Sequence, residues 1–210
     1  MSRYMNRFLT LALIASPFVS AGPVQVGQGA FTSPTVLNFN TIGNEVSITN
    51  QYAGQGATFS GGIFGLTNFG DTSQFPGTPT SIASDWLYSQ SAHGSLPITV
   101  TFSATQNLVG FLDEVNAGDT TVISTFLNGV PDGSVTLLSS GLTAVFLGVS
   151  DTTGFNSITI NVTGPGNHFI GLDNFEFQGS ATGTPEPATL GLLAAGFGMI
   201  GLLRTKRRIR

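Results

Sequence analysis

Few side chains in this sequence can do acid, base or nucleophilic chemistry. The chain has two histidines and no cysteine, and no lysine or arginine occurs between residues 22 and 184. His93 lies in a polar Ser-Ala-His-Gly-Ser stretch, and His168 begins the last predicted strand. A Gly-x-Ser-x-Gly turn, which presents the nucleophile of many hydrolases, is absent from the sequence. We therefore interpret neither histidine as a catalytic base.

Carboxylates are the second source of chemistry, because a glycosidase needs two of them beside the scissile bond. Asp113 and Glu114 are adjacent, so a strand directs them to opposite faces, and Asp173 and Glu176 also differ in parity. No basic side chain accompanies them to hold a substrate. We interpret these acids as solvated loop residues and expect no enzyme. A glycoside hydrolase or lyase on a jelly roll stays the alternative.

Two aromatic residues are the candidates for sugar contact. Trp86 and Tyr88 share one face if their segment is extended, and flat rings of these types bind sugars. Trp86 would serve equally well as a core anchor, because it is the only tryptophan. Ice-binding surfaces need regular threonine ladders, and we interpret Thr99 with Thr101, and Thr78 with Thr80, as isolated pairs.

Short alternating runs separated by turn signals must position these residues. Residues 98–102 and 158–162 alternate, whereas 121–127 and 144–149 are apolar on both faces, as in central strands. Asn128-Gly129 and Asp132-Gly133 predict a hairpin or turn between two such runs. Many short strands with Gly, Pro, Asn and Asp turns predict an all-β fold, an antiparallel β-sandwich of the jelly-roll kind.

Two details of this prediction can be tested against a structure. In residues 169–177 the phenylalanines occupy odd positions and the aliphatic residues even ones. Either both faces of this strand are covered, or a bulge near Asp173-Asn174 shifts its register. We also expect a surface loop from Gly65 to Pro79, which is rich in glycine, serine and proline.

The charges divide the 210 residues into three parts. All seven basic side chains lie near the two ends, whereas the interval 22–184 carries ten carboxylates and a formal charge of −10. Nucleic-acid binding depends on lysine and arginine neutralising phosphates, so this composition argues against a nucleic-acid partner. Enzymes that clamp phosphate groups are disfavoured for the same reason.

The first segment, residues 1–21, is typical of a secretory signal peptide. Arg3 and Arg7 precede a short apolar run, and Val19-Ser20-Ala21 supplies small residues for signal peptidase. We predict cleavage between Ala21 and Gly22, which starts a domain over residues 22–180.

The last segment, residues 181–210, has three consecutive elements. A small polar linker leads to Pro185-Glu186-Pro187, then to an uncharged run from Ala188 to Leu203. Sixteen helical residues span about 24 Å, slightly less than a bilayer core, and basic side chains at the end can extend this reach. The positive-inside rule leaves the basic tail in the cytoplasm. That tail consists of Arg204, Lys206, Arg207, Arg208 and Arg210.

These three elements resemble the PEP-CTERM sorting signal over residues 184–210. Such tags occur on exported proteins of Gram-negative bacteria that make exopolysaccharide, and on some ice-binding proteins. The resemblance implies that an exosortase, a membrane-embedded cysteine peptidase or transpeptidase, cleaves near Pro185-Glu186-Pro187 and releases the body. The alternative is a permanent single-span anchor.

The body resembles secreted bacterial jelly rolls of the galactose-binding-like and carbohydrate-binding-module group. The resemblance rests on residues 36–39, 51–61 and 169–177. It implies a structural calcium ion between an early loop and the last strand, held here by Glu45 and Asp173 with carbonyls near residues 38–40. We expect no other cofactor. The sequence thus predicts an exported structural or adhesive protein of a polysaccharide matrix at the cell surface, in contact with carbohydrate through Trp86 and Tyr88.

Overall fold

The computed structural model describes residues 22–66, 96–138, 144–165 and 168–180, together with the backbone of 82–84, 86–87 and 92–93. The expected signal helix and the apolar C-terminal helix lie outside the described residues, as do both cleavage positions apart from Gly22. Within the described ranges, no helix has the length and apolar character needed to cross a bilayer.

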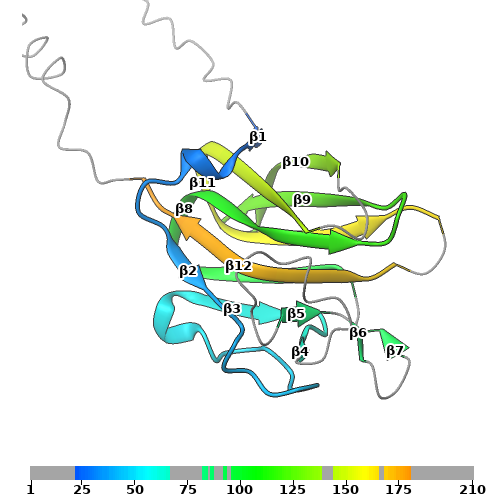
Figure 1. The fold of residues 1–210 in the computed structure, drawn as a ribbon. Helices are drawn as coiled ribbons and strands as arrows, with labels where there is room; N and C mark the ends of the chain where they lie inside the picture. Colours follow the sequence, from blue (N-terminus) through cyan, green and yellow to red (C-terminus); the bar gives the residue numbers. More distant parts are fainter. Residues whose placement is uncertain are drawn as a thin grey trace, which may run out of the picture.

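Strands are the main elements of the described part, and two short 3-10 turns lie between them (Figure 1). The elements in chain order are β1 (Val24–Val26), η1 (Gln28–Ala30), β2 (Thr35–Leu37), η2 (Ala53–Gln55), β3 (Ala57–Ser60), β4 (Phe64–Leu66), β5 (Ile82–Ser84), β6 (Trp86–Leu87), β7 (Ala92–His93), β8 (Ile98–Val115), β9 (Thr120–Leu127), β10 (Val130–Leu138), β11 (Val145–Thr163) and β12 (Ile170–Gln178).

Two long strands, β8 and β11, each run through both layers of a sandwich. In layer A, residues 157–160 of β11 pair with 98–101 of β8, and β3, β9 and β10 extend the sheet on either side. In layer B, residues 145–150 of β11 pair with 108–113 of β8, flanked by β1 and β12. β2 and β5 pair with β12, and β4 pairs with β5. The predicted antiparallel β-sandwich is therefore confirmed.

The alternation of the sequence produces the layer A core. Ile98, Val100 and Phe102 of β8 are buried, and so are the facing residues Ile158 and Ile160 of β11. The intervening residues of both strands point to the opposite face of the sheet. β9 and β10 are joined at Asn128-Gly129, where both residues have positive φ, 53° and 78°. Positive φ at both positions is typical of a type I′ hairpin turn, which Asn-Gly favours. The expected turn at Asp132-Gly133 is wrong, because these residues lie inside β10, where the register with β9 shifts between Pro131 and Gly133.

Both alternatives considered for the last strand hold, because β12 is buried on both faces and also contains a bulge. The pairing of β12 with β8 shifts register between Asp173 and Glu176, and Asn174 has a φ of 46°. This bulge moves Phe175 and Phe177 onto the same inward face as Ile170 and Leu172.

Two boundaries differ from the sequence prediction. Residues 144–149 and 158–162 are parts of one bent strand, β11, because Gly154, with a φ of 81°, carries the chain from one layer to the other. The expected loop from Gly65 is wrong at its start, since Gly65 and Leu66 belong to β4. Leu66 is buried against Leu112 and Ala144, and that burial holds it in the sheet. Residues 67–79 of that loop lie outside the described part.

The outer face of layer B is covered by the start of the chain. The Phe146 ring lies over Gly110 and Gly148, where an added Cβ would come within 2.4 and 2.8 Å of it. Phe31 packs edge-on against this ring at a centroid distance of 5.8 Å. β1 and the segment after it therefore close layer B on its outer side.

Replacing a phenylalanine that is packed between the layers should strongly lower the stability of the protein. Phe175 is fully buried, with the Phe59, Phe102 and Phe111 rings 5.5, 6.4 and 5.9 Å away. We expect Phe175→Ala to lower the free energy of unfolding by about 3–5 kcal/mol, because it leaves a cavity. Urea denaturation measures this loss. Val130→Ala, at a 65% exposed site, should change it by less than about 0.5 kcal/mol.

Candidate functional site

Buried carboxylates are the most unusual chemical feature of the described body. Six of them are almost inaccessible to solvent: Asp113, Glu114, Asp119, Asp151, Asp173 and Glu176. The interpretation of four of these as solvated loop acids is therefore wrong. They lie on β8 and β12, which run through the middle of layer B and are covered on both faces.

Asp173 combines deep burial with an unsatisfied oxygen. Its side chain is 1% exposed and accepts hydrogen bonds from the backbone N–H groups of Phe39 and Asn174. Its second oxygen, Oδ1, has no hydrogen-bond partner. Burial raises the pKa of Asp173 from 3.8 to about 6, although the two N–H groups act in the opposite direction. Burial of the Tyr52 hydroxyl raises the pKa of Tyr52, and the nearby Asp173 charge adds to this shift.

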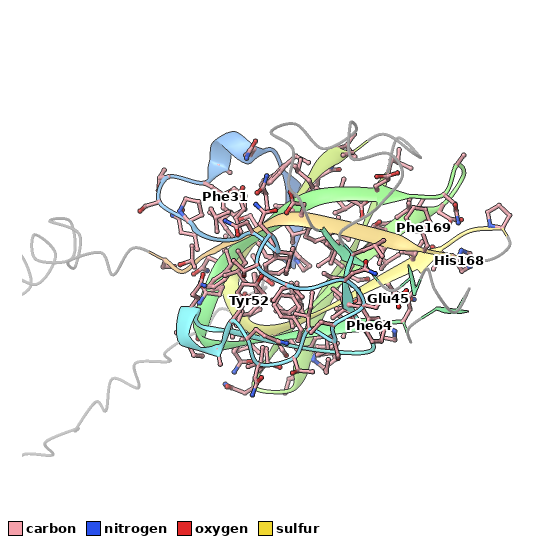
Figure 2. All side chains as sticks on the ribbon, turned by 60° about the horizontal axis from the view of Figure 1, so that its bottom comes forward. Phe31, Glu45, Tyr52, Phe64, His168 and Phe169 are labelled. Carbon is pink, nitrogen blue, oxygen red and sulfur yellow. The ribbon has the colours of Figure 1, made fainter. Side chains whose placement is uncertain are left out.

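Both expected calcium ligands, Asp173 and Glu45, lie among the described residues. Asp173 lies against the backbone of residue 39, in the predicted early loop, with a free oxygen of the type that calcium prefers. The carbonyl of Asn38 already accepts a 2.7 Å hydrogen bond from the Tyr52 hydroxyl. Glu45 is half-buried on the same loop, beside Phe64 in Figure 2, and its N–H donates to the Gly65 carbonyl.

A complete ligand set is not assembled there. Among the residues that the structure describes, no three His, Asp or Glu side chains are grouped to hold a metal ion. Calcium binding by Asp173 and Glu45 accordingly stays a prediction that needs further oxygens from the backbone or from water.

Two other acids face each other at the crossing between the layers. The Asp151 and Asp132 carboxyl groups hydrogen-bond to each other, and Asp151 also accepts from the Thr125 hydroxyl at 3.0 Å and the Thr153 N–H at 2.9 Å. Burial is the main cause that raises the pKa of Asp151, and Asp132 adds to it. A glycosidase pair stands about 5–9.5 Å apart across a substrate. Carboxyls in direct contact, one of them buried, do not match that arrangement.

The histidines do not form a catalytic triad either. His168 Nδ1 lies 3.1 Å from Oδ2 of buried Asp119, an orientation that an aspartate gives a catalytic histidine. Within the described residues, no serine or threonine hydroxyl is recorded at hydrogen-bond distance from this ring. His93 lies on the short strand β7, where its backbone pairs with Trp86.

The aromatic and sorting residues are only partly visible. The backbone of Trp86 belongs to β6, but its side chain and all of Tyr88 lie outside the described residues. The same holds for Pro185-Glu186-Pro187 and the basic tail. The structure therefore does not test these positions.

One pocket lies where β1 and the end of β12 meet the bend of β11. Its volume is about 430 Å³, and its lining includes Asn107, Asp151 and Ser180 but no aromatic residue. The Asn107 side chain donates to the Asp151 carbonyl at 2.7 Å and accepts from the Ser180 N–H at 2.9 Å. This bonding anchors Ser180 to Asn107, and Asp151 is the one acid among the described residues that line the pocket.

A surface feature that the sequence reading missed lies on the outer face of layer A. One cross-strand row contains only hydroxyl side chains, because the register places them opposite one another on five strands. This hydroxyl row is Ser60, Thr99, Thr159, Ser124 and Ser134, on β3, β8, β11, β9 and β10. Thr99 was interpreted as part of an isolated pair, since its neighbours come from distant parts of the chain. The alternating serines and threonines of each strand were the available signal.

Comparison with known proteins adds little. No protein-family model and no curated protein matches the sequence. Among solved structures, an adhesin domain of Lys-gingipain shares 13% identity at a TM-score of 0.45, covering 70% of this chain and 99% of that one. The catalytic domain of a GH87 alpha-1,3-glucanase in complex with tetrasaccharides shares 18% at 0.36, covering 69% and 31%. The enzymatically active domain of bacteriophage CBA120 tailspike protein 4 shares 14% at 0.38, covering 64% and 21%. Such values establish no function for this chain.

Because the pKa of Asp173 is raised, we expect mild acid to stabilise the folded protein. Because the folded protein binds this proton more tightly than the unfolded chain, stability rises as the pH falls through about 6 towards 3.8. A shift of about two pKa units corresponds to about 3 kcal/mol, and Asp151 and Glu176 act in the same direction. Denaturant unfolding between pH 4 and 7.5 without calcium measures this. Asp173→Asn should flatten the profile, and an unchanged profile would contradict the assignment.

Calcium bound at Asp173 should offset the cost of burying the Asp173 carboxylate. If the ion binds at Asp173, millimolar calcium raises the melting temperature by several degrees and a chelator reverses the rise. Asp173→Asn and Glu45→Gln should abolish the response. Asp113→Asn is the matched control, because that carboxylate accepts hydrogen bonds from Thr121 at 3.1 and 3.2 Å. A melting curve of the unaltered protein that ignores both calcium and chelator would count against the site.

Proposed function

We propose that this chain is an exported, non-catalytic β-sandwich protein that acts structurally or as an adhesin in the exopolysaccharide matrix or at the cell surface of a Gram-negative bacterium. Signal peptidase and an exosortase would be its processing partners. The membrane would hold it only through residues 188–203 before release, and extracellular polysaccharide would be its ligand.

The observation that carries this proposal is the order of elements at the C-terminus. The sequence Pro185-Glu186-Pro187, an uncharged run and a basic tail follow one another in the last 26 residues, 185–210. Each element has a physical role in sorting: a restricted peptide for cleavage, an apolar segment for the bilayer, and positive charge that stays in the cytoplasm. The charge of the body supports the same interpretation, since it suits a neutral ligand better than a polyanion.

Processing is the direct test of this proposal. Expressed in a host with an exosortase, the protein should lose residues 1–21 and end near residue 187, as measured by intact mass. Glu186→Ala should leave the tail attached and the protein in the inner membrane. Asp132→Asn, in the folded body, serves as the control and should be processed normally. A wild-type protein that keeps residues 188–210 would instead be a permanently anchored envelope protein.

The enzymatic alternative makes a different prediction. The full-length protein should release no reducing sugar from the polysaccharide of its host. Release that Asp132→Asn or Asp119→Asn abolishes would contradict the non-catalytic role. A glycan array of the wild type against Trp86→Ala tests whether that ring takes part in binding.

A further inference from the structure

We infer that the hydroxyl row on layer A is a binding site for one chain of a neutral polysaccharide, lying across the five strands. This inference rests on the proposed function, which places the protein among polysaccharides, and it names the surface and the chemical class of the ligand.

The charge of the face selects a neutral partner. The described interior strands of layer A direct no charged side chain outward, although the body as a whole carries −10. On either side of the row, the outward positions are again mostly hydroxyls. These hydroxyls are Thr58, Thr101 and Ser157 on one side and Thr136 on the other; Asn161, Phe126 and Val122 are the other outward positions, all uncharged. A phosphate or uronate polymer would find no cation here, whereas an uncharged glycan meets no repulsion.

The geometry of the row suits an extended polymer. Neighbouring strands stand about 4.8 Å apart, so five hydroxyls extend over about 19 Å. The structure records no side-chain hydrogen bond from these five hydroxyls to any other described residue, so their donors and acceptors face outward. Each hydroxyl can both donate and accept, and a glycan presents hydroxyls with the same double capacity.

Apolar side chains border the row at its centre. Val122 lies two positions before Ser124 on β9 and Phe126 two positions after it, on the same face, and both are partly exposed. A sugar ring offers a C–H face to such groups while its hydroxyls reach the row. The row therefore combines hydrogen-bonding groups with an adjacent ring, which is the pairing that a glycan chain requires.

The irregularity of the face argues against an ice surface as the ligand. The row next to the hydroxyl row, Thr58, Thr101 and Ser157, is interrupted by Phe126 on β9. On the other side, Val122 interrupts the sequence between Asn161 and Thr136. A crystal plane needs repetition in two directions, and only one direction repeats here. A linear polymer needs no more than that.

A binding assay with matched variants tests the inference. The full-length protein in mild detergent is incubated with insoluble cellulose, chitin and β-1,3-glucan, and with alginate beads as the anionic polymer. We expect retention on at least one neutral polymer and none on alginate. Thr159→Lys, at the centre of the row, should weaken binding by at least about tenfold. Ser33→Lys makes the same charge change at an exposed site before β2 and should bind as the wild type does.

A second variant protects the test against misfolding. Thr159→Val keeps the shape and removes only the hydroxyl, so it should weaken binding several-fold while the melting temperature stays within about 2 °C of the wild type. If Thr159→Lys loses binding and also unfolds, the binding of Thr159→Val alone decides the test.

Several outcomes would overturn the inference. They are no retention on any neutral polymer, retention that Thr159→Val and Thr159→Lys leave unchanged, and inhibition of ice recrystallisation without polysaccharide binding. Sorting is measured separately by the mass and location of the protein. A correctly processed protein with unaltered binding in the row variants would refute this site and leave the proposed function standing.

Discussion

Burying carboxylates without any cation is the constraint on which much of this structure depends. The interval 22–184 has no lysine or arginine, yet six of its acids are hidden from solvent. Without lysine or arginine, these acids draw their hydrogen bonds from hydroxyls, backbone N–H groups, the His168 ring at Asp119 and the Asp132 carboxyl at Asp151. Thr121 and Thr125 occupy inward positions on β9, where an aliphatic side chain would otherwise be expected, and donate to Asp113 and Asp151. The bulge of β12 directs the Asn174 N–H to Asp173.

The need to bury carboxylates without lysine or arginine also makes the two outer faces of the sandwich different. Layer B keeps its acids out of water because the first residues of the body fold over it, with Phe31 against Phe146. Layer A has mainly aliphatic and aromatic residues inside and uncharged side chains outside, many of them hydroxyls, so burial of charge does not require a cover there. The outer face of layer A, which stays exposed to solvent, is consequently the less charged of the two outer faces. This division explains why a strongly acidic body can still offer a neutral surface.

Local patterns predicted the parts of the fold that depend on local chemistry. The Asn128-Gly129 turn, the alternating strands and the bulge at Asp173-Asn174 follow from backbone preference and period-two burial. The continuity of β11 through Gly154 did not follow, because a change of layer looks like a loop in the sequence. The burial of Asp113 and Glu114 was missed, since charge predicts exposure unless the covering segments are known. The hydroxyl row depends on register between strands up to 99 residues apart, from Ser60 to Thr159, which no single run of residues reveals.

The two long strands also determine how the molecule would transmit force. β12 ends at Gln178 and is held along β8, while the hydroxyl row crosses other residues of β8 and β11. Tension between the end of β12 and a ligand on layer A would thus run along the covalent backbone of β8 from one layer to the other. The packed phenylalanines between the layers would not have to resist being pulled apart. Detachment would instead require the hydrogen bonds along β12 and β8 to shear together, which is the loading direction that a β-sheet withstands best.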